Sequence, residues 1–170
     1  MKTILTNLPK IIATILGLTL AVFVVVAIIN SLFLFKFENQ FETNEKLKGT
    51  ECRDTISACG DLAGTDDFTY MAAALIEVKE NAKDIDKEKI KKYYEGSSGG
   101  LEGAADSTHT VKVEVFELEN DTGVFTPSLF PDRSYMFNDT TTVRDFDRCY
   151  VVVIYDMGNS APLDYRTYFA

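Results

Sequence analysis

The sequence predicts an α+β protein: an N-terminal transmembrane helix with an amphipathic stalk, then short helices packed on an antiparallel β-sheet. Three observations lead to this fold class. A long uncharged apolar run stands near the N-terminus, apolar residues then recur at helical spacing as far as residue 94, and from Thr110 the spacing becomes that of strands. Helices followed by strands favour an antiparallel sheet over an alternating parallel one.

The first element is the apolar run from Ile11 to Phe35, which contains no charged residue. As a helix it extends roughly 37 Å at ~1.5 Å per residue, enough to cross a hydrocarbon core of ~30 Å. The run ends in bulky Leu32, Phe33, Leu34 and Phe35, where a signal peptide has small residues before its cleavage site. We therefore expect residues 11–36 to be an uncleaved signal anchor, with the lipid bilayer as the partner of Ile11 to Phe35.

The charges on either side of this run predict its orientation. Lys2 and Lys10 precede it, whereas Glu38, Glu42 and Glu45 come soon after Lys36. Positive residues favour the cytoplasmic side. We expect a single-pass protein of the cell membrane, with residues 1–10 as a cytoplasmic stub and residues 61–170 as an extracytoplasmic α+β domain.

The part of the chain after Phe35 is strongly acidic. It holds all 26 acidic residues and 15 of the 17 basic ones, which is a formal charge of −11. Such a charge repels phosphate backbones, so nucleic acid is excluded as an expected partner. The lysines of residues 84–94 alternate with Asp86 and Glu88, a pattern typical of a solvated helix face.

The next elements are predicted as helices. Residues 37–60 are expected to form a juxtamembrane helical stalk, in which Thr50 caps a last short helix and Gly60 ends it. Cys52, Ile56 and Cys59 would then share one helix face. A second helix over residues 66–82 carries a stripe of five apolar residues: Phe68, Met71, Leu75, Val78 and Ala82. A third runs from about Asp86 to Tyr94 and stops at Gly96.

The strands come last. Residues 111–119 alternate with period two, residues 120–123 form a turn, and residues 124–126 begin a return strand. The run CYVVVIYD, residues 149–156, is apolar on both faces and predicts a central strand. Residues 163–169 come after a further turn.

The three cysteines are candidates for a disulfide, since an exported domain lies in an oxidising compartment. A bridge between Cys52 and Cys59 is excluded if their segment is helical, because they would stand ~10 Å apart along the axis. We therefore expect Cys149 to pair with Cys52 or Cys59, which leaves one buried thiol or an intermolecular link. The C-x₆-C spacing is wider than the cysteine pairs of zinc sites, and no cofactor is predicted.

Other residues carry weaker signals. Asn120 and Asn138 begin N-x-[ST] sequons and are candidate glycosylation sites. Ala13, Gly17 and Ala21 recur every four residues and form a candidate helix–helix contact inside the anchor. The single histidine, His109, is expected at the surface or at a strand edge.

The function that these features predict is a non-enzymatic structural or protein-interaction module, with self-association or other envelope proteins as partners. An alternative comes from resemblance. An apolar N-terminal helix, its amphipathic continuation and an antiparallel sheet resemble type IV pilin-like and pseudopilin-like filament subunits. That family has a glutamate at the fifth mature position, whereas this chain has no acid from Met1 to Phe37. A membrane-anchored hydrolase is a third alternative and would need a buried carboxylate pair, with candidates in Asp145, Asp147 and Asp156.

Overall fold

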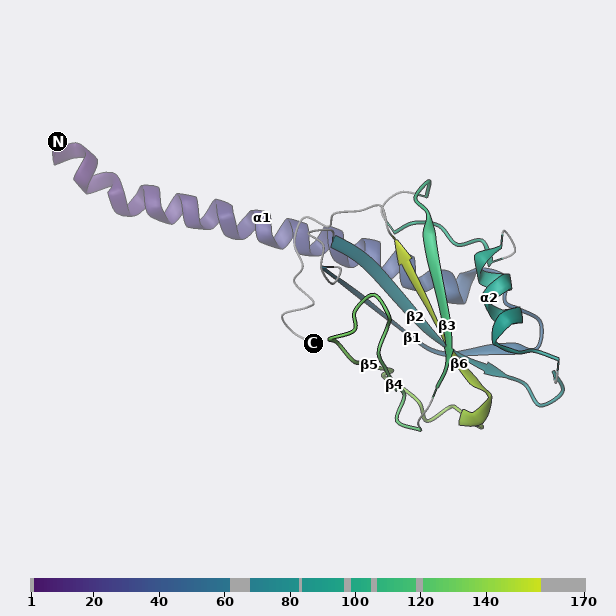
Figure 1. The fold of residues 1–170 in the computed structure, drawn as a ribbon. Helices are drawn as coiled ribbons and strands as arrows, with labels where there is room; N and C mark the ends of the chain where they lie inside the picture. Colours follow the sequence, from purple (N-terminus) through teal and green to yellow (C-terminus); the bar gives the residue numbers. More distant parts are fainter. Residues whose placement is uncertain are drawn as a thin grey trace.

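The structure is a computed structural model, and it describes residues 2–61, 68–82, 84–96, 99–104, 107–118 and 121–156. One long helix, α1, comes first, and strands dominate the rest of the described chain (Figure 1). The elements in chain order are α1 (Lys2–Thr43), β1 (Thr50–Asp61), β2 (Phe68–Val78), α2 (Lys87–Glu95), β3 (Val111–Glu117), β4 (Val124–Phe125), β5 (Tyr135–Met136), the 3₁₀ helix η2 (Phe146–Arg148) and β6 (Cys149–Asp156).

Four strands form one antiparallel sheet in the order β1-β2-β6-β3. Ala72 of β2 lies opposite Ile154 of β6, and Val115 of β3 lies opposite Val152 of β6. Strands β4 and β5 pair separately as a small hairpin. The predicted central strand is confirmed, because β6 has a neighbour on each side and its residues from Val151 to Asp156 are all buried.

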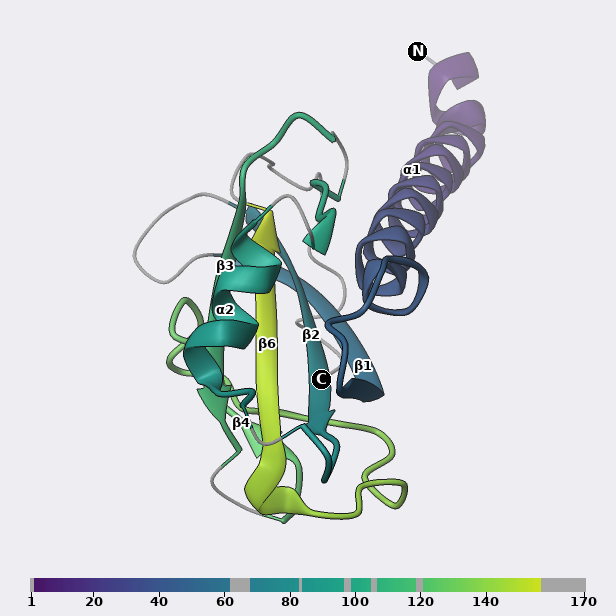
Figure 2. The ribbon, with the colours of Figure 1, turned by 90° about the vertical axis from the view of Figure 1, so that its right-hand side faces the viewer.

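The head, by which we mean the part of the structure from Asn30 onward, has three layers. One face of the sheet packs against the C-terminal half of α1 and against α2, and the other face packs against the loop that carries β4 and β5. Figure 2 shows α2 lying across β6 and β3, with α1 on the side of β1 and β2. The N-terminal half of α1 extends away from these layers (Figure 1).

Several predictions from the sequence are confirmed. The fold is α+β, with a long apolar N-terminal helix followed by an antiparallel sheet that packs against helices. Helix α2 starts where expected, since the Asp86 side chain accepts a hydrogen bond from the Lys89 backbone amide at 2.8 Å. Gly96 caps its end. The sequon at Asn120 and residues 163–169 lie outside the described residues.

The predicted helix over residues 50–60 is wrong, because this segment is strand β1. The chain turns between α1 and β1 at Gly49, whose φ of 94° suits glycine. A Cβ there would also meet the Cβ of Ala82 at 2.7 Å. The helical part of residues 37–60 therefore ends at Thr43, and the whole of this range belongs to the head.

The predicted helix over residues 66–82 is also wrong, because β2 occupies Phe68–Val78. Every residue from Tyr70 to Val78 is buried. When nearly every position of a run is apolar, some of its apolar residues fall at helical spacing by chance. The spacing of apolar residues therefore cannot distinguish a buried strand from a buried helix. The small side chains of Ala72 and Ala74 face α1 and leave room for its aromatic residues.

Candidate functional site at the junction of the anchor helix and the head

The free half of α1, which we define as Leu8–Ile29, exposes apolar side chains on all sides. Leu16, Leu18 and Leu20 are 64%, 65% and 66% exposed. The helix is long and apolar enough to span a membrane, and no residue of its most apolar stretch is buried inside the described structure. At ~1.5 Å per residue the free half extends roughly 33 Å, close to the thickness of a hydrocarbon core.

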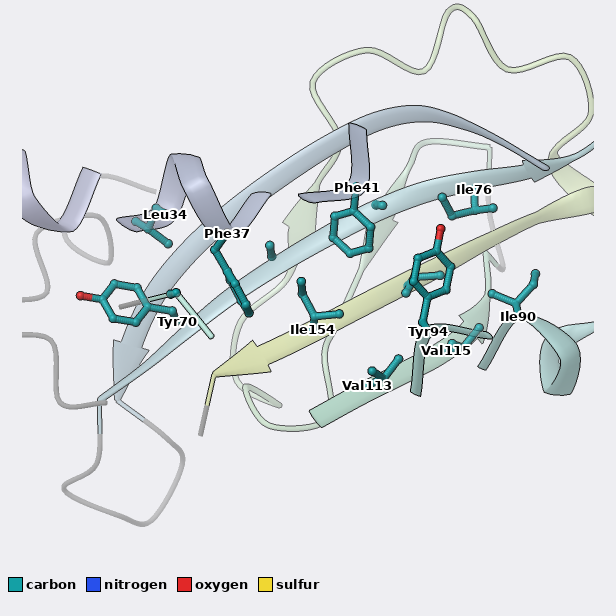
Figure 3. Packing of buried hydrophobic residues seen from close by; sticks show 14 of the residues in the cluster. Leu34, Phe37, Phe41, Tyr70, Ile76, Ile90, Tyr94, Val113, Val115 and Ile154 are labelled. Carbon is teal, nitrogen blue, oxygen red and sulfur yellow. The ribbon is translucent and has the colours of Figure 1, made fainter. Parts of the chain in front are cut away.

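The packed half of α1, Asn30–Thr43, buries one face against the sheet. This face consists of four residues at helical spacing, each at most 2% exposed: Asn30, Leu34, Phe37 and Phe41. Figure 3 shows Leu34, Phe37 and Phe41 pointing from the helix toward the sheet, among Ile76, Ile154 and Tyr94. The predicted boundary of the anchor at residue 36 therefore falls inside the packed half, since Leu34 is part of the head's core.

A buried polar contact stands where the two halves of α1 meet. The Tyr70 hydroxyl donates a hydrogen bond of 3.0 Å to Asn30 Oδ1, and both residues are almost fully buried. An asparagine in an apolar helix is costly unless it is hydrogen-bonded. The contact therefore favours one depth of the helix relative to the sheet.

A second set of polar contacts ties the helix to residues 99–104, which we call the clasp segment. Asn44 Nδ2 donates to the carbonyls of Gly99 and Gly100 at 3.1 and 2.8 Å. Gln40 both donates to the Glu102 carbonyl and accepts from the Glu102 amide, at 2.9 and 2.7 Å. Because Gln40 is only 8% exposed, these bonds lie largely out of water.

A third contact joins α1 to the edge strand β1. Glu38 accepts hydrogen bonds from the hydroxyls of Thr55 and Ser57, at 2.9 and 2.5 Å. Thr55 and Ser57 lie two residues apart on one face of β1, so both reach the same carboxylate. Sequence reasoning missed Glu38, Gln40 and Asn44, because each looks like an ordinary polar residue until its partner from a distant segment is known.

The cysteines do not meet, and the structure carries all three as free thiols. Cys59 and Cys52 lie on the sheet face that packs against α1, whereas Cys149 lies on the opposite face. A register shift between Cys52 and Asp54 places the two β1 cysteines on one face although they are seven residues apart. The predicted bridge from Cys149 to Cys52 or Cys59 is therefore wrong, since the sheet separates the partners.

The thiol environments also oppose reactivity. Burial raises the pKa of Cys52 to about 11 and that of Cys149 to about 12. The thiolate is the reactive form of cysteine. Cys52 and Cys149 are therefore protonated, weakly reactive core residues at neutral pH.

The carboxylates named for a hydrolase lie at opposite ends of β6. Asp156 is fully buried and accepts from the Ala104 amide at 2.6 Å, with His109 Nδ1 at 3.2 Å from its other oxygen. Asp145 instead caps η2 by accepting from the Asp147 amide. His109 is thus partly buried and paired with Asp156, and Asp156 forms no carboxylate pair with Asp145 or Asp147.

The remaining sequence candidates lie at the surface. Asn138 is exposed beside β5, as a glycosylation acceptor must be. Ala13, Gly17 and Ala21 lie on the free half of α1, and a Cβ placed at Gly17 meets no described atom within 4 Å apart from its chain neighbours and the backbone of its own helix. The described structure therefore leaves this helix face open.

One buried ion pair also escaped sequence reasoning. Arg53 Nε lies 2.5 Å from Glu77 Oε2, and their side chains are 11% and 7% exposed. The other oxygen of Glu77 accepts from the amides of Arg144 and Asp145 at 3.1 Å each. Because its lone pairs are satisfied by these groups, Glu77 connects β2, β1 and the loop before β6, which is a structural role.

At the junction, the exposed apolar half of α1 continues without a break as a core helix, and polar contacts to the sheet and to the clasp segment hold it there. Comparison with protein-family models, with curated proteins and with solved structures finds no match for this chain.

Proposed function

We propose that this chain is a single-pass membrane protein that holds a folded acidic head at the outer surface of the cell membrane. Its N-terminus lies in the cytoplasm, and the head serves as a non-enzymatic structural or protein-interaction module. The flanking charges support this orientation: Lys2 and Lys10 precede the apolar run, and the acidic residues come after it.

One observation carries the proposal: the helix that is long enough to span a bilayer is also a core helix of the head. No loop separates the two halves of α1, and the Asn30–Tyr70 bond stands at the point where they join. A head attached in this way cannot swing freely, as it would on a flexible linker. Rigid attachment suits a protein that presents a surface at a defined distance and direction from the membrane.

The orientation is tested by cysteine labelling on intact cells with a membrane-impermeant maleimide. We expect Glu88→Cys on exposed α2 to be labelled at once, and Thr6→Cys to be labelled only after permeabilisation. The unmodified chain is the blank, since its own thiols are buried or partly buried. Labelling of Thr6→Cys alone on intact cells would show the opposite orientation.

A filament subunit of the pilin-like kind is the second candidate, and the outward face of α1 favours it. By ~100° per residue, Ala13, Gly17, Ala21, Val24, Ser31 and Phe35 form one stripe that points away from the sheet. The stripe continues beside the head, where Phe35 is 67% exposed and Leu32, one turn before it on the helix, is 61% exposed. Helices of neighbouring subunits could cover such a stripe in a bundle.

The two candidates differ in what can be recovered from cells. A filament subunit is released by shearing as a fibre visible by electron microscopy, and Gly17→Cys subunits cross-link into ladders within it. A separately anchored module stays in the membrane fraction, where the same variant gives dimers at most.

A further inference from the structure

The edge strand β3 borders a groove whose form suits an extended peptide. The groove has a volume of about 700 Å³. It lies between β3 and β4, which belong to different sheets and do not pair. Figure 2 shows β3 at the outer edge of the sheet, opposite the edge formed by β1. Its lining includes Lys87, Glu114, Phe116, Glu117 and Phe125.

The backbone of β3 offers unused hydrogen-bonding groups to this side. The Leu118 amide donates to the Cys149 carbonyl at 3.2 Å, so Leu118 and Cys149 are a hydrogen-bonded pair of the antiparallel ladder. Along such a ladder, hydrogen-bonded pairs alternate with pairs that are not hydrogen-bonded to each other. Val113, Val115 and Glu117 therefore direct their amides and carbonyls away from β6, and no described residue bonds to these outward groups.

The other edge of the sheet is different. Strand β1 has a register shift at Arg53, and bulges of this kind hinder pairing with a further strand. The ladder of β3 with β6 runs without a shift from Val111 to Glu117. Of the two edges, β3 is the one whose ladder is regular over its whole length, whereas the longest regular part of the β1 ladder runs from Asp54 to Asp61.

The side chains at the groove indicate what the added strand must carry. On the side of the hairpin, the rings of Phe116 and Phe125 lie 5.8 Å apart and offer an apolar surface. Glu114 is already bonded by the Tyr155 hydroxyl and the Ser128 amide. On the side of α2, Glu117 is exposed and carries a charge in a head whose acidic residues outnumber its basic ones.

We infer that β3 binds an extended peptide segment by strand addition, with apolar side chains toward Phe116 and Phe125 and basic side chains toward Glu117. Main-chain hydrogen bonds supply affinity in this mode, and alternate side chains supply selectivity. The inference rests on the proposed role as an interaction module and names its class of partner. It does not depend on the orientation of the head in the membrane.

The test measures fluorescence anisotropy of a labelled heptapeptide of alternating lysine and valine, added to the full chain in detergent micelles. We expect saturable binding by the wild type. Glu117→Pro should weaken it about tenfold or more, because proline removes an outward donor without touching the ladder. Glu117→Gln is the matched control, which keeps the amide, and should weaken binding only two- to threefold.

A second peptide separates strand addition from attraction between charges. It has the same sequence with an N-methyl group on every backbone amide, so it keeps the side-chain charges and loses all of its main-chain donors. We expect it not to bind. The inference would be overturned by any of three results. These are equal binding of both peptides, an equal loss of peptide affinity in Glu117→Pro and Glu117→Gln, and no binding of the unmethylated peptide by the wild type. A reversed topology in the labelling experiment, by contrast, would overturn only the proposed orientation.

Discussion

The two halves of α1 make contrasting surfaces from the same helix. In the free half, large apolar side chains are exposed on all sides, as Leu20 is at 66%. In the packed half, Leu34 and Phe37 are 0% exposed while Phe35, between them, is 67% exposed. The backbone is helical throughout, so the difference lies in the neighbours: the sheet covers one side of the packed half and nothing in the described chain covers the free half.

This contrast shows that a helix long and apolar enough to span a membrane and a core helix have the same kind of sequence. Both are apolar, because burial of apolar side chains is favourable in lipid as well as in a protein core. What distinguishes the packed half is its polar residues at special positions. Asn30, Glu38 and Gln40 each form a hydrogen bond to a residue that follows the helix in the chain, and no ionisable residue occurs in the free half beyond Lys10.

The largest effect is expected from truncation at two places. Removal of residues 1–29 should leave a folded and soluble head, because it takes only the free half. Removal of residues 1–43 should abolish cooperative unfolding, since it takes Leu34, Phe37 and Phe41 from the core. Each such loss costs about 2–5 kcal/mol, against a typical stability of about 5–15 kcal/mol. Circular dichroism during heating distinguishes the outcomes, and a cooperative transition in the shorter product would disprove the role of the packed half.

A smaller effect is expected from single substitutions two residues apart. Phe37→Ala should lower the free energy of unfolding by about 3–5 kcal/mol, because it leaves a cavity beneath the helix. Phe35→Ala should change it by less than about 0.5 kcal/mol, because that side chain points away from the sheet. Denaturant titration of the full chain in detergent measures both. Similar losses in the two variants would mean that the packed face is assigned wrongly.

The polar contact at the boundary should contribute less. Asn30→Ala is expected to lower the free energy of unfolding by about 1–3 kcal/mol, since it leaves the buried Tyr70 hydroxyl without this acceptor. A double-mutant cycle with Tyr70→Phe isolates the contribution of the bond. A coupling energy of zero would show that the bond does not hold the helix at its depth.

The head should lose stability in alkaline solution through its buried thiols. The pKa of Cys52 is raised by burial to about 11 and that of Cys149 to about 12, whereas exposed thiols ionise near pH 9. Folding therefore favours the protonated thiols. Their contribution is complete below about pH 9 and is lost as the pH rises toward 11 and 12. Unfolding measured from pH 8 to 11 should show this loss, and Cys52→Ser should make it shallower.

The smallest effect on folding is expected from Gly17→Leu in the free half. Apart from its chain neighbours and the backbone of its own helix, no described residue lies within 4 Å of a Cβ at this position, so the free energy of unfolding of the head should change by less than about 0.5 kcal/mol. A bulky residue should nevertheless weaken any close approach of two anchor helices. Chemical cross-linking in membranes measures that approach, and a destabilised head would show that the free half is coupled to the core.

The sequence by itself determined the elements whose signals are local. The anchor helix is predicted by length and apolarity, α2 by the cap at Asp86 and the stop at Gly96, and β3 and β6 by alternation and a β-branched run. Each of these depends on residues next to one another in the chain. Their assignment therefore needs no knowledge of the segments that pack against them.

Only the tertiary structure decided the rest. Strands β1 and β2 also carry apolar residues at helical spacing, and they become strands because a sheet supplies backbone partners that a single segment lacks. The bulge at Arg53 placed Cys52 and Cys59 on one face of the sheet. Because Cys149 lies on the other face, it meets neither of them. The contacts of Asn30, Glu38 and Gln40, and the edge of β3 with which no second described strand pairs, likewise depend on residues far apart in the chain. No local pattern can encode them, because they exist only once the helix has packed on the sheet.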